Sequence, residues 1–272
     1  MLSQLVVLGL ASAVAAHGTV SGIIADGVYY QGYNPSYQYI TPAPVVVGWS
    51  IPQDLGNGFV PTTSYGDADI ICHLGATNAQ TAATVKAGGK VQFNWTPWPV
   101  SHKGPMITHL ANCNGPCETV DKTTLKFFKI DAVGIIDPTA EADDYWASDV
   151  MIANNNTWTS VIPLDLSPGN YVARHETIAL HSAQSVGGAQ DYPFCVNLKV
   201  TGSGTANPAG TLGEALYQQT DPGFVYDIYA SPLPTYTTPG PALYSGASSV
   251  KQTYQGVPTA SSTGTYKKRW EA

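Results

Sequence analysis

Charged side chains are scarce in this sequence. Only 11% of the 272 residues are Asp, Glu, Lys or Arg, and 19 acidic residues against 12 basic ones give a net charge of −7. Lysine and arginine are hardly clustered, whereas nucleic acids and anionic membrane surfaces select basic patches. Both classes of partner are therefore excluded, and a neutral or weakly charged partner is expected.

Long hydrophobic runs are also missing beyond the first residues. Residues 1–16 carry an apolar run from Leu5 to Leu10, then small residues, with Val14 and Ala16 where a signal peptidase reads the chain. We therefore expect 1–16 to be a signal peptide and the mature protein to be secreted and extracellular. No later segment is apolar for long enough to span a membrane.

Cleavage after residue 16 would make His17 the first of 256 remaining residues (272 − 16). A terminal histidine offers an α-amine and an imidazole, two nitrogen donors that can chelate one metal ion. Some residue must follow any cleavage site, however, so the position of His17 does not by itself establish a metal site.

Cysteine is limited to four residues, Cys72, Cys113, Cys117 and Cys195. In a secreted chain an even set favours disulfides, and three pairings are possible. The turn-forming Asn-Gly-Pro between Cys113 and Cys117 suits a local bridge, which leaves Cys72 to pair with Cys195. The alternative, a zinc site at Cys113 and Cys117, lacks a second pair of ligands.

No segment has the long 3.6-residue periodicity of a helical protein. Instead, 27 glycines and 20 prolines separate short strand-like segments. Asp26 and Gly27 lie between two such segments and predict a hairpin. Val91, Phe93 and Trp95 alternate with polar residues, as in a half-buried strand. Further strands are expected at 125–130, 158–164, 170–175 and 196–201.

These patterns predict an all-β fold, an immunoglobulin- or fibronectin-like β-sandwich with long decorated loops and little helix. Residues 17–246 are expected to form one domain, in which the Gly/Pro/Tyr-rich segment 203–246 supplies long ordered loops. From 247 the composition shifts to Ser, Thr and Gly, which predicts a flexible tail over 247–272.

Two kinds of residue could interact with carbohydrate: tyrosines that contact a sugar ring and asparagines that carry a glycan. A turn-rich segment, 32–39, contains three tyrosines, among them Tyr37 and Tyr39. Tyrosines on a loop can stack on sugar rings or can merely cover a sheet edge, and the sequence weights the two interpretations equally. Asn94 and Asn155 each begin an Asn-x-Thr acceptor sequence for N-glycosylation, with Asn155 in the more loop-like context.

Most of the six histidines need no functional explanation, because a single histidine is more often a hydrogen-bonded structural residue than a ligand. That interpretation is preferred for His73, His109 and His175. His102 differs because its loop, 97–105, contains three prolines. Stiff loops on a scaffold often hold ligands.

Two later segments, 174–183 and 188–193, supply His181 and further polar candidates. If residues 190–192 are extended, Gln190 and Tyr192 point to one face and Asp191 points to the other.

Several motifs occur in order along the chain. They are the His17 junction, Ser101-His102-Lys103-Gly104-Pro105, Cys113-Asn114-Gly115-Pro116-Cys117, Arg174 to Ala183, Gly188-Ala189-Gln190-Asp191-Tyr192-Pro193, Asp221-Pro222-Gly223 and Pro239-Gly240-Pro241. Together they resemble the fungal cellulose-active lytic polysaccharide monooxygenases of auxiliary activity family nine. The resemblance covers about residues 17 to 246.

This resemblance implies a copper site of the histidine-brace type. The α-amine and Nδ1 of His17 and Nε2 of His102 would bind one copper ion (Cu²⁺/Cu⁺), with the Tyr192 hydroxyl on the axial side. Cu(II) prefers such nitrogen and oxygen donors. An α-amine with a pKa of about 8 can release its proton to the metal, whereas an uncleaved precursor would present an amide. Signal removal would therefore assemble the site.

The resemblance also implies roles beyond the metal ligands. His181 and Gln190 would act with Tyr192 in catalysis by donating hydrogen bonds to the reacting oxygen species; the alternative is a buried, mutually satisfied polar pair. Tyr229 matches an exposed aromatic on the flat substrate face of the family. Further candidates for substrate contact are Tyr37, Tyr39 and Tyr236.

The implied activity is oxidative cleavage of β-1,4 bonds in cellulose by hydroxylation at C1 and/or C4. It requires O₂ or H₂O₂ and an external electron donor, either a small reductant or a redox protein, and we expect a monomer. One alternative is a non-catalytic polysaccharide-binding sandwich. Another is a hydrolytic endoglucanase, which needs two spaced carboxylates; Asp143, Asp144 and Glu176 are available but lie in no recognisable acid/nucleophile motif.

Overall fold

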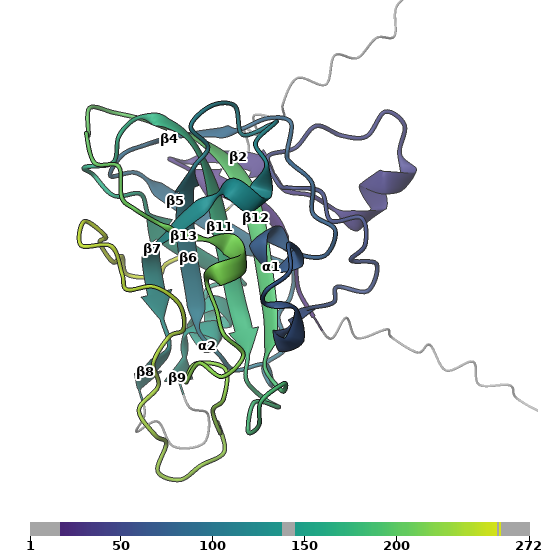
Figure 1. Cartoon of the computed structure of the whole chain (residues 1–272), viewed down its shortest axis with the longest axis vertical. Coiled ribbons are helices and arrows are strands. Elements are labelled where there is room, and N and C mark those ends of the chain that lie inside the picture. The colour runs from purple at the N-terminus through teal and green to yellow at the C-terminus, as the bar shows by residue number, and fades with distance from the viewer. Residues whose placement is uncertain (1–16, 138–144, 255, 257–272) are drawn as a thin grey trace, which may run out of the picture.

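The computed structural model describes residues 17–137, 145–254 and 256, and most of its regular structure is β-strand (Figure 1). The expected signal peptide, 1–16, lies outside the described residues, as does most of the expected tail. The strands are β1 (Val20–Ala25), β2 (Val28–Gln31), β3 (Val60–Pro61), β4 (Ala83–Lys86), β5 (Lys90–Trp95), β6 (Met106–Asn112), β7 (Lys126–Val133), β8 (Ile135–Asp137), β9 (Tyr145–Trp146), β10 (Thr157–Val161), β11 (Gly169–Ala179), β12 (Gln190–Thr201) and β13 (Thr211–Leu212).

Helices are few and short in the described part of the chain. They are α1 (Asp69–Cys72) and α2 (Ala147–Ala153), with 3₁₀ turns η1 (Pro35–Tyr39), η2 (Thr62–Ser64), η3 (Lys122–Thr124) and η4 (Gly213–Ala215). None of these helices is long and apolar enough to cross a membrane.

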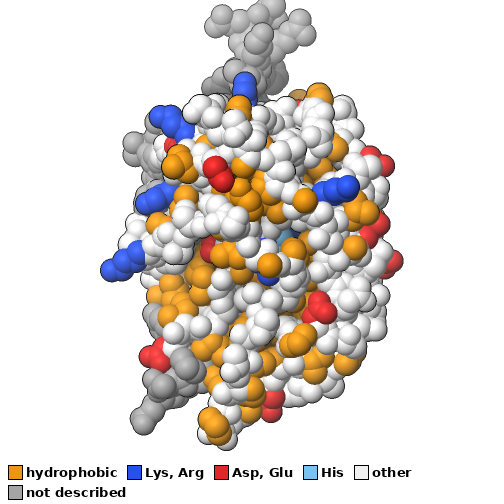
Figure 2. Space-filling view, turned by 60° about the vertical axis from the view of Figure 1, so that its left-hand side comes forward, with side chains coloured by type: hydrophobic (Ala, Val, Ile, Leu, Met, Phe, Trp, Pro, Cys, Tyr) orange, Lys and Arg blue, Asp and Glu red, His pale blue; other side chains and the backbone are white. Residues whose placement is uncertain are grey.

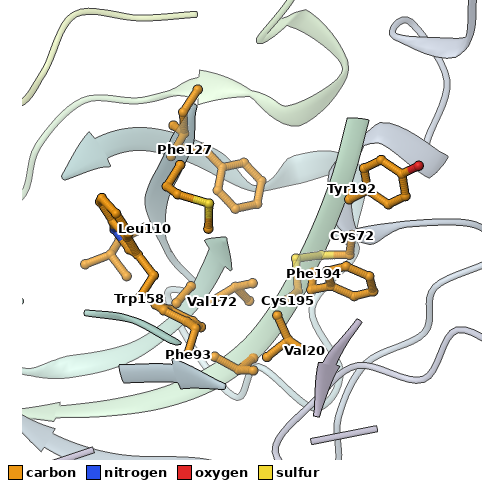
Figure 3. Packing of buried hydrophobic residues seen from close by; sticks show 14 of the residues in the cluster. Val20, Cys72, Phe93, Leu110, Phe127, Trp158, Val172, Tyr192, Phe194 and Cys195 are labelled. Carbon is orange, nitrogen blue, oxygen red and sulfur yellow. A yellow bond between two sulfur atoms is a disulfide. The ribbon is translucent and has the colours of Figure 1, made fainter. Parts of the chain in front are cut away.

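Two sheets form the body of the molecule. A four-stranded sheet has the order β10-β5-β1-β2, and a seven-stranded sheet runs β13-β7-β6-β11-β12-β3, with β4 pairing beside β12. All of these pairs are antiparallel except β4 with β12. Side chains from both sheets meet in one core, where Phe93 and Trp158 of the smaller sheet lie near Leu110 and Val172 of the larger (Figure 3). The predicted β-sandwich is therefore confirmed.

The predicted hairpin between the first two strands is also confirmed. Ala25 pairs with Val28, so only Asp26 and Gly27 form the turn. Both have positive φ, 48° and 83°, as a two-residue type I′ turn requires. Glycine adopts this conformation freely and aspartate is among the residues that tolerate it.

β5 differs from its expected half-buried form, because both of its faces are covered. It lies between β1 and β10, and its polar residues Gln92 and Asn94 are buried, with Gln92 Nε2 donating to Asn94 Oδ1 at 3.1 Å. The burial of Asn94 disfavours a glycan at this residue in the folded chain, and its glycosylation stays a prediction. Asn155, by contrast, is exposed in a turn with φ 58°.

Both predicted disulfides are present. Cys113–Cys117 closes the turn after β6. Cys72–Cys195 joins α1 to β12 across 123 residues of sequence, and it lies beside Phe194 in the core (Figure 3). The second bridge therefore attaches the long connection between β3 and β4 to the central part of the larger sheet.

The C-terminal part of the described chain is mostly loop. Within 203–246 only β13 and η4 are regular, although Tyr217 and Phe224 are buried in the core. Beyond residue 246, Gln252 contacts the edge strand β10: its Oε1 accepts from the Thr159 N–H at 2.8 Å, and its Nε2 donates to the Thr159 carbonyl at 2.9 Å. The first residues of the segment expected to be a flexible tail are thus bonded to the sandwich.

Candidate metal centre

The candidate ligands meet at one end of the sandwich. His17 lies three residues before β1, His102 precedes β6, and Gln190 and Tyr192 lie at the start of β12. His181 follows β11, whose end pairs with the start of β12 through Ala179 and Gln190. Five residues that are up to 175 positions apart (192 − 17) therefore lie at neighbouring strand ends.

Glycine brings the loop of His102 close to the β11 end. A Cβ on Gly104 would overlap the carbonyl oxygen of Ile178, so only glycine fits there. The close approach allows the Leu180 N–H to donate to the Lys103 carbonyl at 2.9 Å. His102 and His181, each next to one of these bonded residues, are thereby placed side by side.

The rings of these residues are in mutual contact. The ring centroids of His17 and His102 are 5.4 Å apart, and those of His102 and His181 are 4.1 Å apart. Tyr192 lies 5.6 Å from His17 and 4.9 Å, edge to face, from Trp98. The structure thus brings together the residues that the sequence motifs singled out.

One nitrogen of His102 is left free by this arrangement. Its Nδ1 lies 3.1 Å from Ser101 Oγ, and its carbonyl accepts from Trp98 Nε1 at 2.9 Å. Its Nε2 is buried and has no hydrogen-bond partner among the described residues. A buried polar atom without a partner is costly, so Nε2 is suited to binding a metal.

Burial favours the neutral form of all three imidazoles. It lowers the pKa of His102 to about 4, with further repulsion from His181 and His17. Burial also lowers the pKa of His17, against the opposing charge of Asp54, and lowers the pKa of His181. Only a neutral imidazole has a lone pair for a metal, so the rings are ready to bind one near neutral pH.

Gln190 and Tyr192 share a face of β12, as predicted. The Tyr192 hydroxyl donates to Gln190 Oε1 at 2.9 Å and points away from the core cluster (Figure 3). Burial, with the charges of Asp54 and Asp191, raises the pKa of Tyr192, so the phenol keeps its proton. Asp191 lies on the opposite face, 3.6 Å from Arg174.

Within the part of the chain that the structure describes, no cluster of metal-binding side chains lies elsewhere. Across the described ranges, no group of three or more His, Cys, Asp or Glu side chains is placed to hold a metal ion. The candidate centre contains only two of the expected side-chain nitrogen ligands, from His17 and His102, and its third nitrogen belongs to the backbone of residue 17. The donors present therefore fit copper bound at a chain terminus.

A comparison with protein families identifies the family to which the chain belongs. The model of Auxiliary Activity family 9 (formerly GH61) matches residues 17–236, beginning at His17. The chain belongs to auxiliary activity family 9. The family consists of lytic polysaccharide monooxygenases, copper-dependent oxidoreductases that cleave cellulose oxidatively.

Individual family 9 proteins are close in sequence and structure. The chain is 64% identical over 263 residues to AA9 family lytic polysaccharide monooxygenase I of Botryotinia fuckeliana, covering 97% of each chain. It is 58% identical to monooxygenase B of Aspergillus tamarii, covering 90% of this chain and 64% of that one. The solved extended catalytic domain of LPMO9A from H. jecorina superposes with a TM-score of 0.85 at 52% identity, over 91% of this chain and 98% of that one.

Among the tyrosines expected to contact substrate, Tyr229 lies closest to the family 9 site. It is 66% exposed, and its hydroxyl donates to the His181 carbonyl at 3.2 Å. Tyr39 is 75% exposed on η1, whereas Tyr37 is half-buried with its ring edge against Tyr33. Gln38 joins η1 to the Pro52 carbonyl at 3.3 Å.

Tyr236, another candidate for substrate contact, is half-buried. Its ring packs edge to face against Trp146 and Tyr226, with centroids 4.9 and 5.1 Å away, and its hydroxyl donates to the Gly223 carbonyl at 3.1 Å. These contacts favour a structural role in anchoring the loops of 203–246, and contact of Tyr236 with substrate stays a prediction.

The other histidines lie in the core, as the structural interpretation expects. His73, His109 and His175 are fully buried, and His175 Nε2 accepts from Trp95 Nε1 at 3.1 Å. Glu176, a candidate for hydrolysis, is also fully buried and ion-paired with Arg174, so it cannot contact a polysaccharide. Asp143 and Asp144 lie outside the described residues.

Sequence reasoning missed two aromatic neighbours of the centre. Trp98 contacts both His102 and Tyr192; its place between two prolines in the His102 loop was the available signal. Phe59 lies 6.3 Å from His17 and 6.0 Å from Tyr192 between ring centroids. Nothing in its local sequence distinguishes it from a core residue.

Proposed function

We propose that the mature chain, beginning at His17, binds one copper ion and oxidatively cleaves β-1,4 bonds in cellulose or a related glucan. The observation that carries the proposal is the buried, partnerless Nε2 of His102 in contact with His17 and His181. The amine and Nδ1 of His17 and Nε2 of His102 would hold the ion, and the Tyr192 hydroxyl would be a further oxygen ligand.

Copper in such a site would supply one-electron chemistry between Cu(II) and Cu(I), with O₂ or H₂O₂ as oxidant and an external donor of electrons. The residues around it have roles of their own. Tyr192 retains its proton, and its hydroxyl donates a hydrogen bond to Gln190 Oε1. The Gln190 amide N–H groups are therefore left to donate elsewhere. His181 Nδ1 is buried without a partner and can hold or pass a proton at that atom.

The surroundings of the site suit a neutral polysaccharide. Tyr229 presents an exposed ring beside His181, and tyrosine can stack on sugar at little entropic cost. The low charge of the sequence agrees with such a partner: on the one face of the molecule that Figure 2 shows, charged side chains are few, with neutral polar and hydrophobic groups between them. The proposal has three further parts: the chain is secreted after removal of 1–16, residues 17–246 form a single domain, and the protein acts as a monomer.

The decisive experiment uses protein whose N-terminus is His17. Loaded with copper and incubated with cellulose, ascorbate and O₂ or H₂O₂, it should release oligosaccharides oxidised at C1 or C4, identified by mass spectrometry. His102→Ala should release none. Reductant-independent release of unoxidised oligosaccharides would instead indicate a hydrolase, and binding to cellulose without copper affinity would indicate a non-catalytic module.

A further inference from the structure

A second buried polar pair, Asp54 and His73, lies outside the set of copper ligands. Both side chains are fully buried, and His73 Nε2 is 3.2 Å from Asp54 Oδ2. The His73 ring packs on Phe194 of β12, with centroids 4.8 Å apart. A buried carboxylate is costly unless it is paired, so the position of Asp54 requires an explanation.

The contacts of Asp54 organise the loop that follows it. Its Oδ1 accepts from the Gly58 N–H, which closes residues 54–58 into a compact turn. Asn57 within this turn has φ 52°. Immediately afterwards, Val60 pairs with Asp191 and thereby attaches the loop to the start of β12. We call residues 54–59 the clamp loop.

The clamp loop reaches the candidate copper ligands from one side. Asn57 Nδ2 donates to the His17 carbonyl at 3.5 Å. Phe59 brings its ring to within 6.3 Å of the His17 ring and 6.0 Å of the Tyr192 ring, between centroids. The clamp loop therefore connects its buried first residue, Asp54, with His17, the residue expected to become the chain terminus.

A terminal ligand needs such support. Chain termini are poorly ordered unless they are tied down, and the proposed copper site takes two of its donors from the first residue. Backbone hydrogen bonding of this segment begins at Thr19, two residues further on, whose carbonyl accepts from the Thr96 N–H at 2.9 Å. Contacts from Asn57 and Phe59 are therefore available to restrict His17 where pairing is not.

The carboxyl group of Asp54 acts in the same direction. It lies beside His73 on this side of the site, and a carboxylate near a metal site favours a bound cation.

We propose that Asp54 is a positioning residue for the copper site: with His73 it fixes the clamp loop, and the clamp loop holds His17 in place. This inference rests on the proposed function. It adds two residues, Asp54 and Asn57, that touch neither copper nor substrate and act through His17.

The test compares variants of the mature protein by three measurements: copper affinity by calorimetry, the Cu(II) electron paramagnetic resonance spectrum, and hydrogen exchange of the copper-free protein. Asp54→Ala removes both the charge and the Gly58 bond, whereas Asp54→Asn can keep the bond without the charge. Asp121→Asn is the control, because Asp121 also accepts a hydrogen bond from a nearby backbone N–H, that of Thr123, but is exposed and precedes η3 rather than the copper site.

We expect Asp54→Ala to bind copper about 10- to 100-fold more weakly, as is typical when support behind a ligand is lost. Its spectrum should shift, and peptides covering 17–20 and 54–59 should exchange faster without copper. Asp54→Asn should be intermediate, and Asp121→Asn should match the wild type. A folded Asp54→Ala variant with wild-type affinity, spectrum and exchange would overturn the inference.

A second variant decides the matter if Asp54→Ala does not fold. Asn57→Gly keeps the positive φ and removes only the amide that contacts His17; it should weaken copper binding several-fold and speed exchange at 17–20. Wild-type values for Asn57→Gly would overturn the inference. If the wild-type protein binds no copper, the proposed function fails, and the exchange of copper-free protein still tests the link between Asp54 and His17.

Discussion

The hydroxyl of Tyr192 donates its hydrogen bond to Gln190 Oε1, two residues earlier on the same face of β12. This bond occupies the oxygen of the Gln190 amide, so only its N–H groups remain free to donate. Tyr192→Phe should release the amide to turn. We expect copper affinity to change by less than about tenfold, because the nitrogen ligands remain, but the yield of oxidised product to fall by roughly tenfold or more. Calorimetry and product quantification on cellulose check both values, and an unchanged yield would contradict the role of this pair.

The first residue gives the second prediction. Adding one glycine before His17 converts its amine to an amide, which binds a metal only after loss of a far less acidic proton. Copper affinity should fall by at least about 100-fold. The matched control is the same extended protein after a protease has removed the glycine, which should recover both affinity and activity. Equal affinity of the extended protein would exclude the amine as a ligand.

Two tyrosines of the C-terminal loops should respond in opposite ways to truncation. Tyr229→Ala removes an exposed ring and should weaken adsorption to cellulose while leaving the melting temperature and copper affinity unchanged. Tyr236→Ala removes a ring packed on Trp146 and Tyr226 and should cost about 3 to 5 kcal/mol of stability, the usual range for a large buried aromatic. Adsorption isotherms and denaturant unfolding separate the two effects, and the reverse pattern would refute the assignment.

The two disulfides should differ in their contribution to stability. Cys72–Cys195 closes a loop of sequence separation 123 and Cys113–Cys117 one of separation 4. In the chain-entropy model, removing the first by paired Cys→Ala substitutions should cost about 5 kcal/mol, against about 2 kcal/mol for the second. Reversible denaturant unfolding measures both losses. Equal losses would show that local packing, and not loop length, sets the effect.

Asp131 gives a prediction of pH dependence far from the copper site. Burial raises the pKa of this carboxyl from 3.8 to about 6, although Trp158 and Ser160 both donate to it. The folded chain therefore holds the Asp131 proton more tightly than the unfolded chain. This difference stabilises the fold below about pH 4, and the stabilisation is lost as the pH rises through 6. Asp131→Asn does not titrate and should gain on the wild type by on the order of 1 to 3 kcal/mol between pH 4 and 7. The exposed Asp121 has a pKa that is lowered by hydrogen bonds from Thr123. Asp121→Asn should therefore lose stability relative to the wild type as the pH rises, the opposite of Asp131→Asn.

Local sequence signals predicted much of the fold. The Asp26-Gly27 turn, the strand at Val91 to Trp95 and the two disulfides follow from turn chemistry, alternation and cysteine spacing, which act within a few residues. The covered outer face of β5 could not be predicted in this way, because the burial of Gln92 and Asn94 depends on segments distant in sequence. For the same reason Asn94 resembled a glycosylation site.

The site was predictable where motifs carry it. His17, His102, His181, Gln190 and Tyr192 were identified by their motifs, and the structure brings them together. Phe59 and Asp54 were not, because neither lies in a distinctive pattern and their importance arises only when the clamp loop folds against His17. The packing of Tyr236 could not be foreseen, because an exposed and an inward-packed tyrosine on a loop look alike in sequence.

The side chain of Gln252 affects how readily the molecule associates with other chains. By bonding both the N–H and the carbonyl of Thr159, its amide imitates one residue of a neighbouring strand at the edge of the smaller sheet. A chain trimmed by a protease at residue 246 would leave these two groups open to solvent. Such an open edge is a template for pairing with another chain, so clipping the C-terminus would convert a sealed margin of the sandwich into a surface prone to self-association.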